Sequence, residues 1–233
     1  MFKAHPHPNP PPRSGGGDIQ PGLSLPSEAG EREDIQPGFS LPSEAMERLE
    51  AYAHLLLKWN GVVHLTSVNT LERIRVSHLL DSLSVVPYVA GAQSLCDVGS
   101  GAGLPGIPLA IALPHLSVTL LESNQKKGHF LHEAVRHCGL SNVQVMVERV
   151  ENYHPAHPFS IVITRAFSSL KQMLQQTAHL CDNEGRFLAM KANVLDRERQ
   201  DVPDEFLLED KITLLVPSLT HRTLWIFKKR NEG

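Results

Sequence analysis

The sequence predicts a doubly wound α/β domain: a mostly parallel seven-stranded sheet with an antiparallel final strand, preceded by helices. Seven short β-rich runs follow residue 93, and helical segments separate most of them. This alternation is typical of a parallel sheet with crossover helices, and the last two runs are too close together for anything but a hairpin. With 233 residues, 41% of them hydrophobic, the chain can bury one sizeable core but not two full domains.

Composition excludes several classes of protein. The 22 basic and 25 acidic residues give a formal charge of −3, so a nucleic acid would have to be held by a local patch. Three cysteines without a C-x-x-C pair exclude a disulfide scaffold and a cysteine-rich zinc site. The chain begins without the apolar stretch of a secretory signal, and its prolines break up the most apolar window. We therefore expect a cytoplasmic protein with no membrane partner and no metal.

Residues 1–42 are predicted to be a disordered tail. Residues 1–45 hold nine of the 17 prolines and six of the 16 glycines, a composition that buries too little apolar surface to offset chain ordering. The segment 18–29 recurs at 34–45 and differs only in Leu23 against Phe39. Two copies are too few for a solenoid. A local duplication or an upstream start explains the repeat, and a peptide ligand is the alternative.

Residues 43–92 are predicted to be helical. Ser43 can cap a helix whose apolar positions follow the 3.6-residue period and which ends near the Asn-Gly pair that begins at Asn60. A second helix is expected to open at Asn69, with a glutamate three residues later as in a capping box, and to run toward the next proline. We expect this region to form one compact unit with a catalytic domain at 93–233.

A glycine-rich segment follows directly on the first β-rich run. It reads Asp97-Val-Gly99-Ser-Gly101-Ala-Gly103-Leu104 and precedes a helical stretch. Glycines there let a ligand approach the backbone and the start of the helix. A dinucleotide fingerprint would need glycine where Leu104 stands, and a phosphate-binding P-loop would need a Gly-Lys pair. The segment therefore predicts a nucleotide-like ligand of another kind, with a structural tight turn as the alternative.

Acidic residues follow the next two strands. Glu122 ends the second strand, and 122 − 99 gives 23 residues from Gly99, close to the offset of about 20 at which a carboxylate reaches a ribose. Glu151 follows the third strand, where such folds often contact adenine. Either side chain could instead be a solvated surface charge.

Basic residues follow the later strands. Arg165 leaves the fourth strand, Lys191 ends the fifth, and Arg222 lies between the last two. The carboxyl ends of parallel strands share one edge, so these cations should point the same way, and arginine binds phosphate bidentately. We expect Arg165 to contact a phosphate or the carboxylate of a cofactor, with Phe167 available to pack on a base. Ordinary surface ion pairs are the alternative.

Taken together, the motifs are similar to those of the glucose-inhibited division protein B family, whose members are bacterial small-subunit rRNA guanine-N7 methyltransferases. The similarity runs from about residue 43 to 230, and only the tail lies outside it. The motifs that carry it are V-H-L-T-S (63–67), H-x-x-D-S (78–82), DVGSGAGLPGIPL (97–109), LLES with two following lysines, RVE (149–151), ITRAF (163–167) and HRTLWIFKK (221–229).

The resemblance implies a class I S-adenosylmethionine-dependent methyltransferase fold. It implies that S-adenosyl-L-methionine is the cofactor and that the methyl group goes to N7 of a guanine in the decoding-region loop of 16S rRNA. The partner would be 16S rRNA or the assembling small subunit, and we expect a monomer. By resemblance, the cofactor site includes Gly99, Leu104, Val150, Glu151 and Arg165.

The same resemblance bears on residues outside that set. Lys127 is implied as an RNA contact, although the family often has arginine there, and His64 and Ala192 stand where asparagine and glycine are usual. Guanine N7 is a lone pair that needs no deprotonation, so no general base is expected. Asp81 and Glu151 are candidates for tempering the charge that moves to the purine.

Two alternatives remain open. A class I methyltransferase acting on a small molecule or a protein would need a closed apolar pocket, and Arg165, Lys191 and Arg222 count against it. A non-catalytic nucleotide-binding module would bind the cofactor without transferring methyl to any RNA.

Overall fold

The sheet has seven strands in the order β3-β2-β1-β4-β5-β7-β6. The computed structural model describes residues 40–165, 167, 169–192 and 201–230, so the predicted disordered tail lies outside the described residues except for 40–42. The strands are β1 (Ser94–Val98), β2 (Ser117–Glu122), β3 (Val143–Val147), β4 (Phe159–Thr164), β5 (Cys181–Lys191), β6 (Phe206–Val216) and β7 (Leu219–Lys229).

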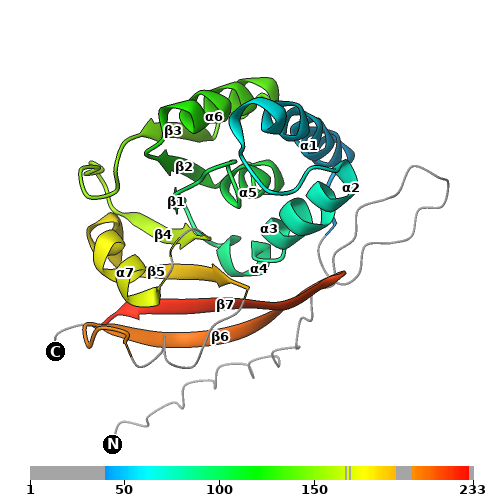
Figure 1. Cartoon of the computed structure of the whole chain (residues 1–233). Helices are drawn as coiled ribbons and strands as arrows, with labels where there is room; N and C mark the ends of the chain where they lie inside the picture. The colour runs from blue at the N-terminus through cyan, green and yellow to red at the C-terminus, as the bar shows by residue number, and fades with distance from the viewer. Residues whose placement is uncertain (1–39, 166, 168, 193–200, 231–233) are drawn as a thin grey trace, which may run out of the picture.

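Strand direction follows the sequence prediction. β3, β2, β1, β4 and β5 run parallel, β7 pairs antiparallel with β5, and β6 and β7 form a long hairpin (Figure 1). The chain moves outward from β1 to β3 and then returns to place β4 on the other side of β1. The doubly wound, mostly parallel fold is therefore confirmed. Its switch point lies between β1 and β4, where ligands bind in such sheets.

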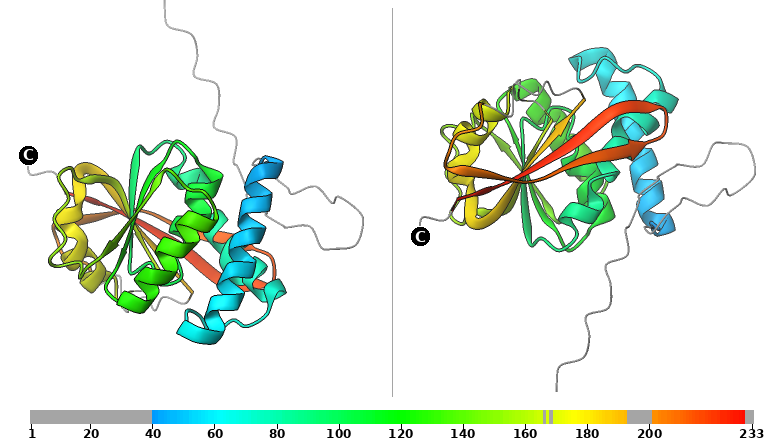
Figure 2. Two further views of the ribbon diagram at one scale, coloured as in Figure 1. Left: turned by 90° about the horizontal axis from the view of Figure 1, so that it is seen from above. Right: turned by 90° about the horizontal axis from the view of Figure 1, so that it is seen from below.

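Helices cover both faces of the sheet. α5 (Gly106–Ala112) and α6 (Gln125–His137) lie on one face, and α1 (Ser43–Val63) packs outside them (Figure 2). α7 (Leu170–Thr177) and the short 3₁₀ turn η2 (Ala178–Leu180) cover the other face. Each face buries its own hydrophobic cluster, so both sides of the central strands are apolar, as parallel sheets require.

The starts of the N-terminal helices differ from the prediction. Pro42 is the N-cap of α1 and Ser43 is its first helical residue, without a side-chain capping bond. The helix continues past Asn60 to Val63 because the carbonyl of Asn60 accepts from the amide of His64, which closes the helix in the left-handed conformation. Thr70, not Asn69, caps the next helix: its hydroxyl accepts from the amide of Arg73.

The second predicted helix is also not continuous. It divides into α2 (Leu71–Ile74), a π-helical segment η1 (Arg75–Leu80), α3 (Asp81–Leu83) and, after a turn, α4 (Val86–Val89). The proline expected to end it lies in the first turn of α4, where proline is tolerated. The π-helical turn places Asp81 and Ser82 in the buried interior.

The junction between β1 and α5 is fixed by a buried carboxylate. Asp97 is fully buried, and its Oδ2 accepts from the backbone amide of Gly106 at 2.9 Å. A Cβ on Gly106 would come within 2.8 Å of that same carboxylate, so glycine is needed for the approach. Burial raises the pKa of Asp97 to about 7, against the opposing effects of the Gly106 amide and Arg165.

This raised pKa predicts a pH-dependent stability. Asp97 titrates near 4 in the unfolded chain and near 7 in the fold, so its contribution is present at low pH and is lost as pH rises from about 4 to 7. Asp97→Asn keeps an acceptor for Gly106 but does not titrate. Between about pH 4 and pH 7, the unfolding free energy of the wild type should therefore decrease by a few kcal/mol more than that of Asp97→Asn. Urea titrations at several pH values test this, and parallel pH profiles would contradict it.

Candidate functional site

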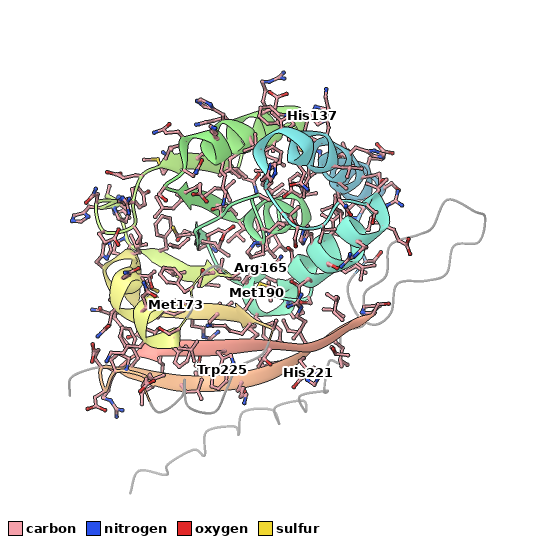
Figure 3. The ribbon with its side chains drawn as sticks, in the orientation of Figure 1. His137, Arg165, Met173, Met190, His221 and Trp225 are labelled. Atoms are coloured by element: carbon pink, nitrogen blue, oxygen red, sulfur yellow. The ribbon has the colours of Figure 1, made fainter. Side chains whose placement is uncertain are left out.

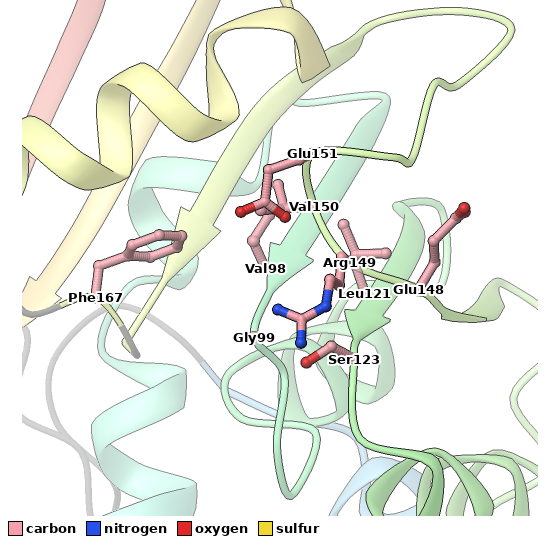
Figure 4. A pocket seen from close by; sticks show the side chains of 9 residues that line it. All are labelled: Val98, Gly99, Leu121, Ser123, Glu148, Arg149, Val150, Glu151 and Phe167. Carbon is pink, nitrogen blue, oxygen red and sulfur yellow. The ribbon is translucent and has the colours of Figure 1, made fainter.

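A cavity of about 190 Å³ opens at the carboxyl ends of β1, β2 and β3, beside the switch point (Figure 4). Gly99 and Val98 form its base, and Phe167 lies across from Arg149 and Glu148. Strand ends supply nearly every wall of this cavity, because parallel strands finish at one edge of the sheet. Its lining residues are Val98, Gly99, Leu121, Ser123, Glu148, Arg149, Val150, Glu151 and Phe167.

The glycine-rich loop lies beside this cavity. Gly99, Gly101 and Gly103 have φ values of 71°, 58° and 84°, a region that residues with a Cβ rarely adopt. The amide of Gly99 donates to the carbonyl of Leu121 at 2.8 Å, which ties the loop to β2. A Cβ on Gly103 would lie 2.4 Å from Ile107, so this glycine is also required by packing. Leu104 is buried behind the loop.

Glu122 holds the loop from the end of β2. Its Oε2 accepts from the amide of Gly101 at 2.9 Å, and its Oε1 accepts from the amide of Asn124 at 2.8 Å. The carboxylate is buried and lies outside the lining of the 190 Å³ cavity. It therefore joins the glycine loop to the start of α6.

The N-terminal helix also reaches this loop. Tyr52 of α1 is fully buried, and its hydroxyl donates to the carbonyl of Ala102, between two of the loop glycines. Burial raises the pKa of this phenol well above its usual value, so it remains a donor throughout the physiological range. The position of α1 and the shape of the loop thus depend on one another.

A second cavity, of about 120 Å³, lies beside the first on the β5 and β7 side. Arg165 lines it, and Phe167, two residues along the chain, lines the first cavity. Figure 3 labels Arg165 and Met190, which both line this cavity. The cavity brings together the predicted cations Arg165, Lys191 and Arg222 with Asp81; its other lining residues are Met190, Ala192, Leu214 and Thr223.

Asp81 is the centre of this charge cluster. Its Oδ2 lies 3.3 Å from Nη2 of Arg165, and its Oδ1 lies 3.2 Å from Nε of Arg222. Burial raises the pKa of Asp81, and the two guanidinium groups oppose that shift. Burial and the same arginines lower the pKa of nearby His78 to about 4, so this imidazole is neutral at physiological pH. Lys191 donates to the carbonyl of Phe167 at 3.1 Å and so connects the two cavities.

Comparisons with known proteins are consistent with this arrangement. The model of a protein family, GidB, described as rRNA small subunit methyltransferase G, matches residues 45–226. The chain belongs to this family. It is 44% identical over 171 residues to ribosomal RNA small subunit methyltransferase G of Chromobacterium violaceum, covering 73% of this chain and 82% of that protein. The protein of the same name from Nitrosomonas eutropha is 45% identical over 171 residues, covering 72% and 79%.

Solved structures that resemble the chain share its fold at low sequence identity. A ribosomal protein L11 methylase from Lactobacillus delbrueckii subsp. bulgaricus matches with a TM-score of 0.52 and 13% identity, over 65% of this chain and 77% of that one. A mutant of MtNAS in complex with S-adenosylmethionine matches with a TM-score of 0.54 and 13% identity, over 78% and 72%. Both support the methyltransferase fold.

For a member of the GidB family, the structure separates the nine predicted cofactor residues into three groups. Gly99, Val150 and Glu151 line the larger cavity. Arg165 lines the smaller one instead. The remaining five line neither cavity and belong to the glycine loop or to the strand ends that hold it: Asp97, Gly101, Gly103, Leu104 and Glu122.

Other residues were missed, or lie away from both cavities. Leu121, Ser123 and Arg149 line the larger cavity, and their places at the ends of β2 and β3 were the signal available in the sequence. Lys127, implied as an RNA contact, lies on α6 outside both linings.

Within the part of the chain that the structure describes, no helix has the length and apolarity needed to cross a membrane, and no cluster of side chains could hold a metal ion.

The contact between α1 and the loop makes a testable prediction. Tyr52→Phe removes the donor to Ala102 and leaves a buried carbonyl without a partner, so it should lower the unfolding free energy by about 1–3 kcal/mol. Tyr88→Phe on α4 is the matched control, since that tyrosine is only half-buried. Chemical denaturation measures both. Equal effects of the two variants would show that the Ala102 contact adds nothing.

Proposed function

We propose that this protein transfers a methyl group from S-adenosyl-L-methionine to N7 of a guanine in bacterial 16S rRNA. The observation that carries the proposal is the pair of adjoining cavities at one sheet edge, the first built on a glycine loop and the second surrounded by cations. Relatives named ribosomal RNA small subunit methyltransferase G support the substrate class. A cation-lined cavity fits RNA better than a small apolar substrate.

The residues around the larger cavity fit the cofactor. Gly101 faces open space apart from one backbone oxygen 3.8 Å from a Cβ built on it, so a ligand can approach the loop closely. Glu151 offers a carboxylate to ribose or adenine donors, and Val98, Leu121 and Val150 offer apolar surface to the purine. A cavity of about 190 Å³ is below the size of pockets that enclose whole ligands, about 300 Å³ or more, so it would enclose only part of the cofactor.

The chemistry asks little of the protein beyond alignment. Bound S-adenosylmethionine supplies an electrophilic methyl group on a sulfonium. Guanine N7 attacks with an in-plane lone pair, so no residue has to remove a proton, and positioning and exclusion of water supply the acceleration. Phe167 lines the larger cavity, and its carbonyl accepts from Lys191, which lines the smaller one.

Charge around the two cavities suits this reaction. The purine gains the positive charge that the sulfonium loses, and each cavity has a carboxylate that can temper it, Glu151 in the larger and Asp81 in the smaller. Arg165, Lys191 and Arg222 would contact the RNA, with Lys127 as an outlying contact. We further propose a cytoplasmic monomer in which residues 43–92 and 93–233 fold as one unit, supported by the bond from Tyr52 to Ala102.

Methyl transfer to unmodified ribosomal subunits tests the function. The protein is incubated with labelled S-adenosylmethionine and small subunits that lack the modification, and the product nucleotide is mapped. We expect label at one guanine N7 in the small-subunit rRNA. Label on a small molecule or a protein instead would favour the alternative methyltransferase. Cofactor binding without transfer to any of these would indicate a non-catalytic binding module.

Gly99→Arg should abolish cofactor binding, because its side chain fills the base of the larger cavity. An arginine at φ 71° also strains the backbone, so the matched control is Gly139→Arg, at φ 62° in open space after α6. Both variants should lose about 1 kcal/mol of stability, while only Gly99→Arg loses cofactor affinity. Calorimetry measures this. Near-normal affinity in folded Gly99→Arg would contradict the assignment of the loop.

Arg222→Ala should weaken RNA binding and reduce the slope of log affinity against log salt by about one, with cofactor affinity unchanged. Arg165→Ala should weaken both, since the resemblance also places it against the cofactor. Arg48→Ala, on α1 and paired with Glu44, is the control for a lost charge elsewhere. A salt series for RNA and calorimetry for the cofactor separate the cases. Loss of cofactor binding alone in Arg222→Ala would refute the arrangement.

A further inference from the structure

The 120 Å³ cavity has a mixed polar character that binding of RNA phosphate does not explain. Nη1 of Arg165 is a buried atom without a hydrogen-bond partner among the described residues. Oδ1 of Asp81 and Nε of Arg222 lie 3.2 Å apart in an ion pair, but neither atom makes a hydrogen bond to a described residue. All three residues line this cavity. Buried polar groups normally have hydrogen-bond partners, so an unmatched donor of Arg165 beside a carboxylate oxygen held only by an ion pair indicates a ligand with the complementary pattern.

We propose that Asp81 and Arg165 read the base of the target guanine: the carboxylate of Asp81 accepts from N1–H and from the 2-amino group, and Arg165 donates to O6. This inference rests on the proposed function and names the residues that give it base specificity. At about 120 Å³ the cavity is well below the size of pockets that enclose whole ligands, so it can take one edge of a base and not a whole nucleotide. Met190 and Leu214 supply apolar walls.

The chemistry selects guanine among the four bases. A carboxylate only accepts hydrogen bonds, so it needs a base edge with two neighbouring donors. Guanine has that pair, with the O6 acceptor beside it, whereas adenine, cytosine and uracil each place an acceptor next to their donor. A base taken out of its stack is commonly recognised through this Watson–Crick edge.

The orientation also suits the reaction. In guanine, N7 lies on the far side of O6 from N1 and the 2-amino group. A base whose Watson–Crick edge enters the Asp81 cavity therefore keeps N7 outside that cavity. N7 is therefore left accessible to a cofactor bound in the cavity that Phe167 lines.

The backbone around Asp81 supports a role beyond stability. Asp81 directly follows the π-helical segment η1, and π-helical turns are rare and often found at functional sites. The side chain is 2% exposed, and burying a charge so completely is costly unless partners hold it. Its ion pairs with Arg165 and Arg222 hold it there, and the histidine one turn earlier, His78, is neutral and adds no charge.

Phosphate is a poorer occupant for the same space. The carboxylate of Asp81 would repel an anion, and it already engages one nitrogen of each arginine. In this arrangement Lys191 and Arg222 contact the RNA backbone at the edge of the cavity. If the cavity held phosphate, removing the charge of Asp81 would strengthen RNA binding and leave base selectivity unchanged.

The experiment compares guanosine and inosine at the target position, since inosine lacks only the 2-amino group. Small subunits are reconstituted with either nucleotide, and kcat/KM is measured for the wild type and for Asp81→Asn. We expect inosine to lower kcat/KM of the wild type about tenfold or more, and that of Asp81→Asn by about twofold or less. Glu151→Gln, in the other cavity, should retain the full inosine penalty.

Each outcome bears on a different claim. No transfer to guanosine by the wild type would overturn the proposed function and this inference with it. Transfer with no inosine penalty in the wild type, or with equal penalties in the wild type and Asp81→Asn, would overturn the inference alone. Tighter RNA binding by Asp81→Asn with unchanged selectivity would identify a phosphate site. Normal cofactor affinity of Asp81→Asn shows that this variant is folded. If Asp81→Asn does not fold, Asp81→Ser replaces it in the experiment. The comparison of guanosine with inosine in the wild type needs no variant, and the absence of an inosine penalty there also contradicts the inference.

Discussion

The hydrogen bond from the Gly106 amide to the buried carboxylate of Asp97 is the constraint on which the site depends. It fixes where α5 begins relative to the end of β1, and the loop between them must then cross a short span. Glycines with positive φ make that crossing possible, and Glu122 anchors its middle from the next strand. Two carboxylates that the sequence indicated as ligand contacts thus shape the loop from behind.

The strands were predictable because each is a short apolar run bounded by turn residues. Runs that are apolar on both faces are typical of a parallel sheet covered by helices. The bounds of the helices before β1 were harder to predict. Thr70 competes with Asn69 for the cap, and either residue suits it by sequence. A π-helical turn has no signature in a 3.6-residue pattern, because the tertiary contacts of Asp81 and Ser82 select it.

The site shows the same division. Arg165, Lys191 and Arg222 follow strands that end at one edge, so topology alone indicated that they would meet, and they line one cavity. Asp81, which pairs with Arg165 and Arg222, comes from a helix far away in sequence, and no spacing rule connects it to the strand-end cations. Leu121 and Ser123 carry no distinctive chemistry, so only the geometry of the strand ends identifies them as lining residues.

The bond between Tyr52 and Ala102 couples the first helix to the ligand loop in a thermodynamic sense. If a ligand orders the loop, ligand binding and the packing of α1 against the loop are coupled equilibria. Ligand binding then stabilises the packing of α1 by the same free energy by which that packing strengthens ligand binding. Amide hydrogen exchange along α1 would then slow on binding, although no residue of that helix lines either cavity. A compound that binds between α1 and the glycine loop and breaks the bond from Tyr52 to Ala102 would accordingly act as an allosteric inhibitor without resembling a nucleoside.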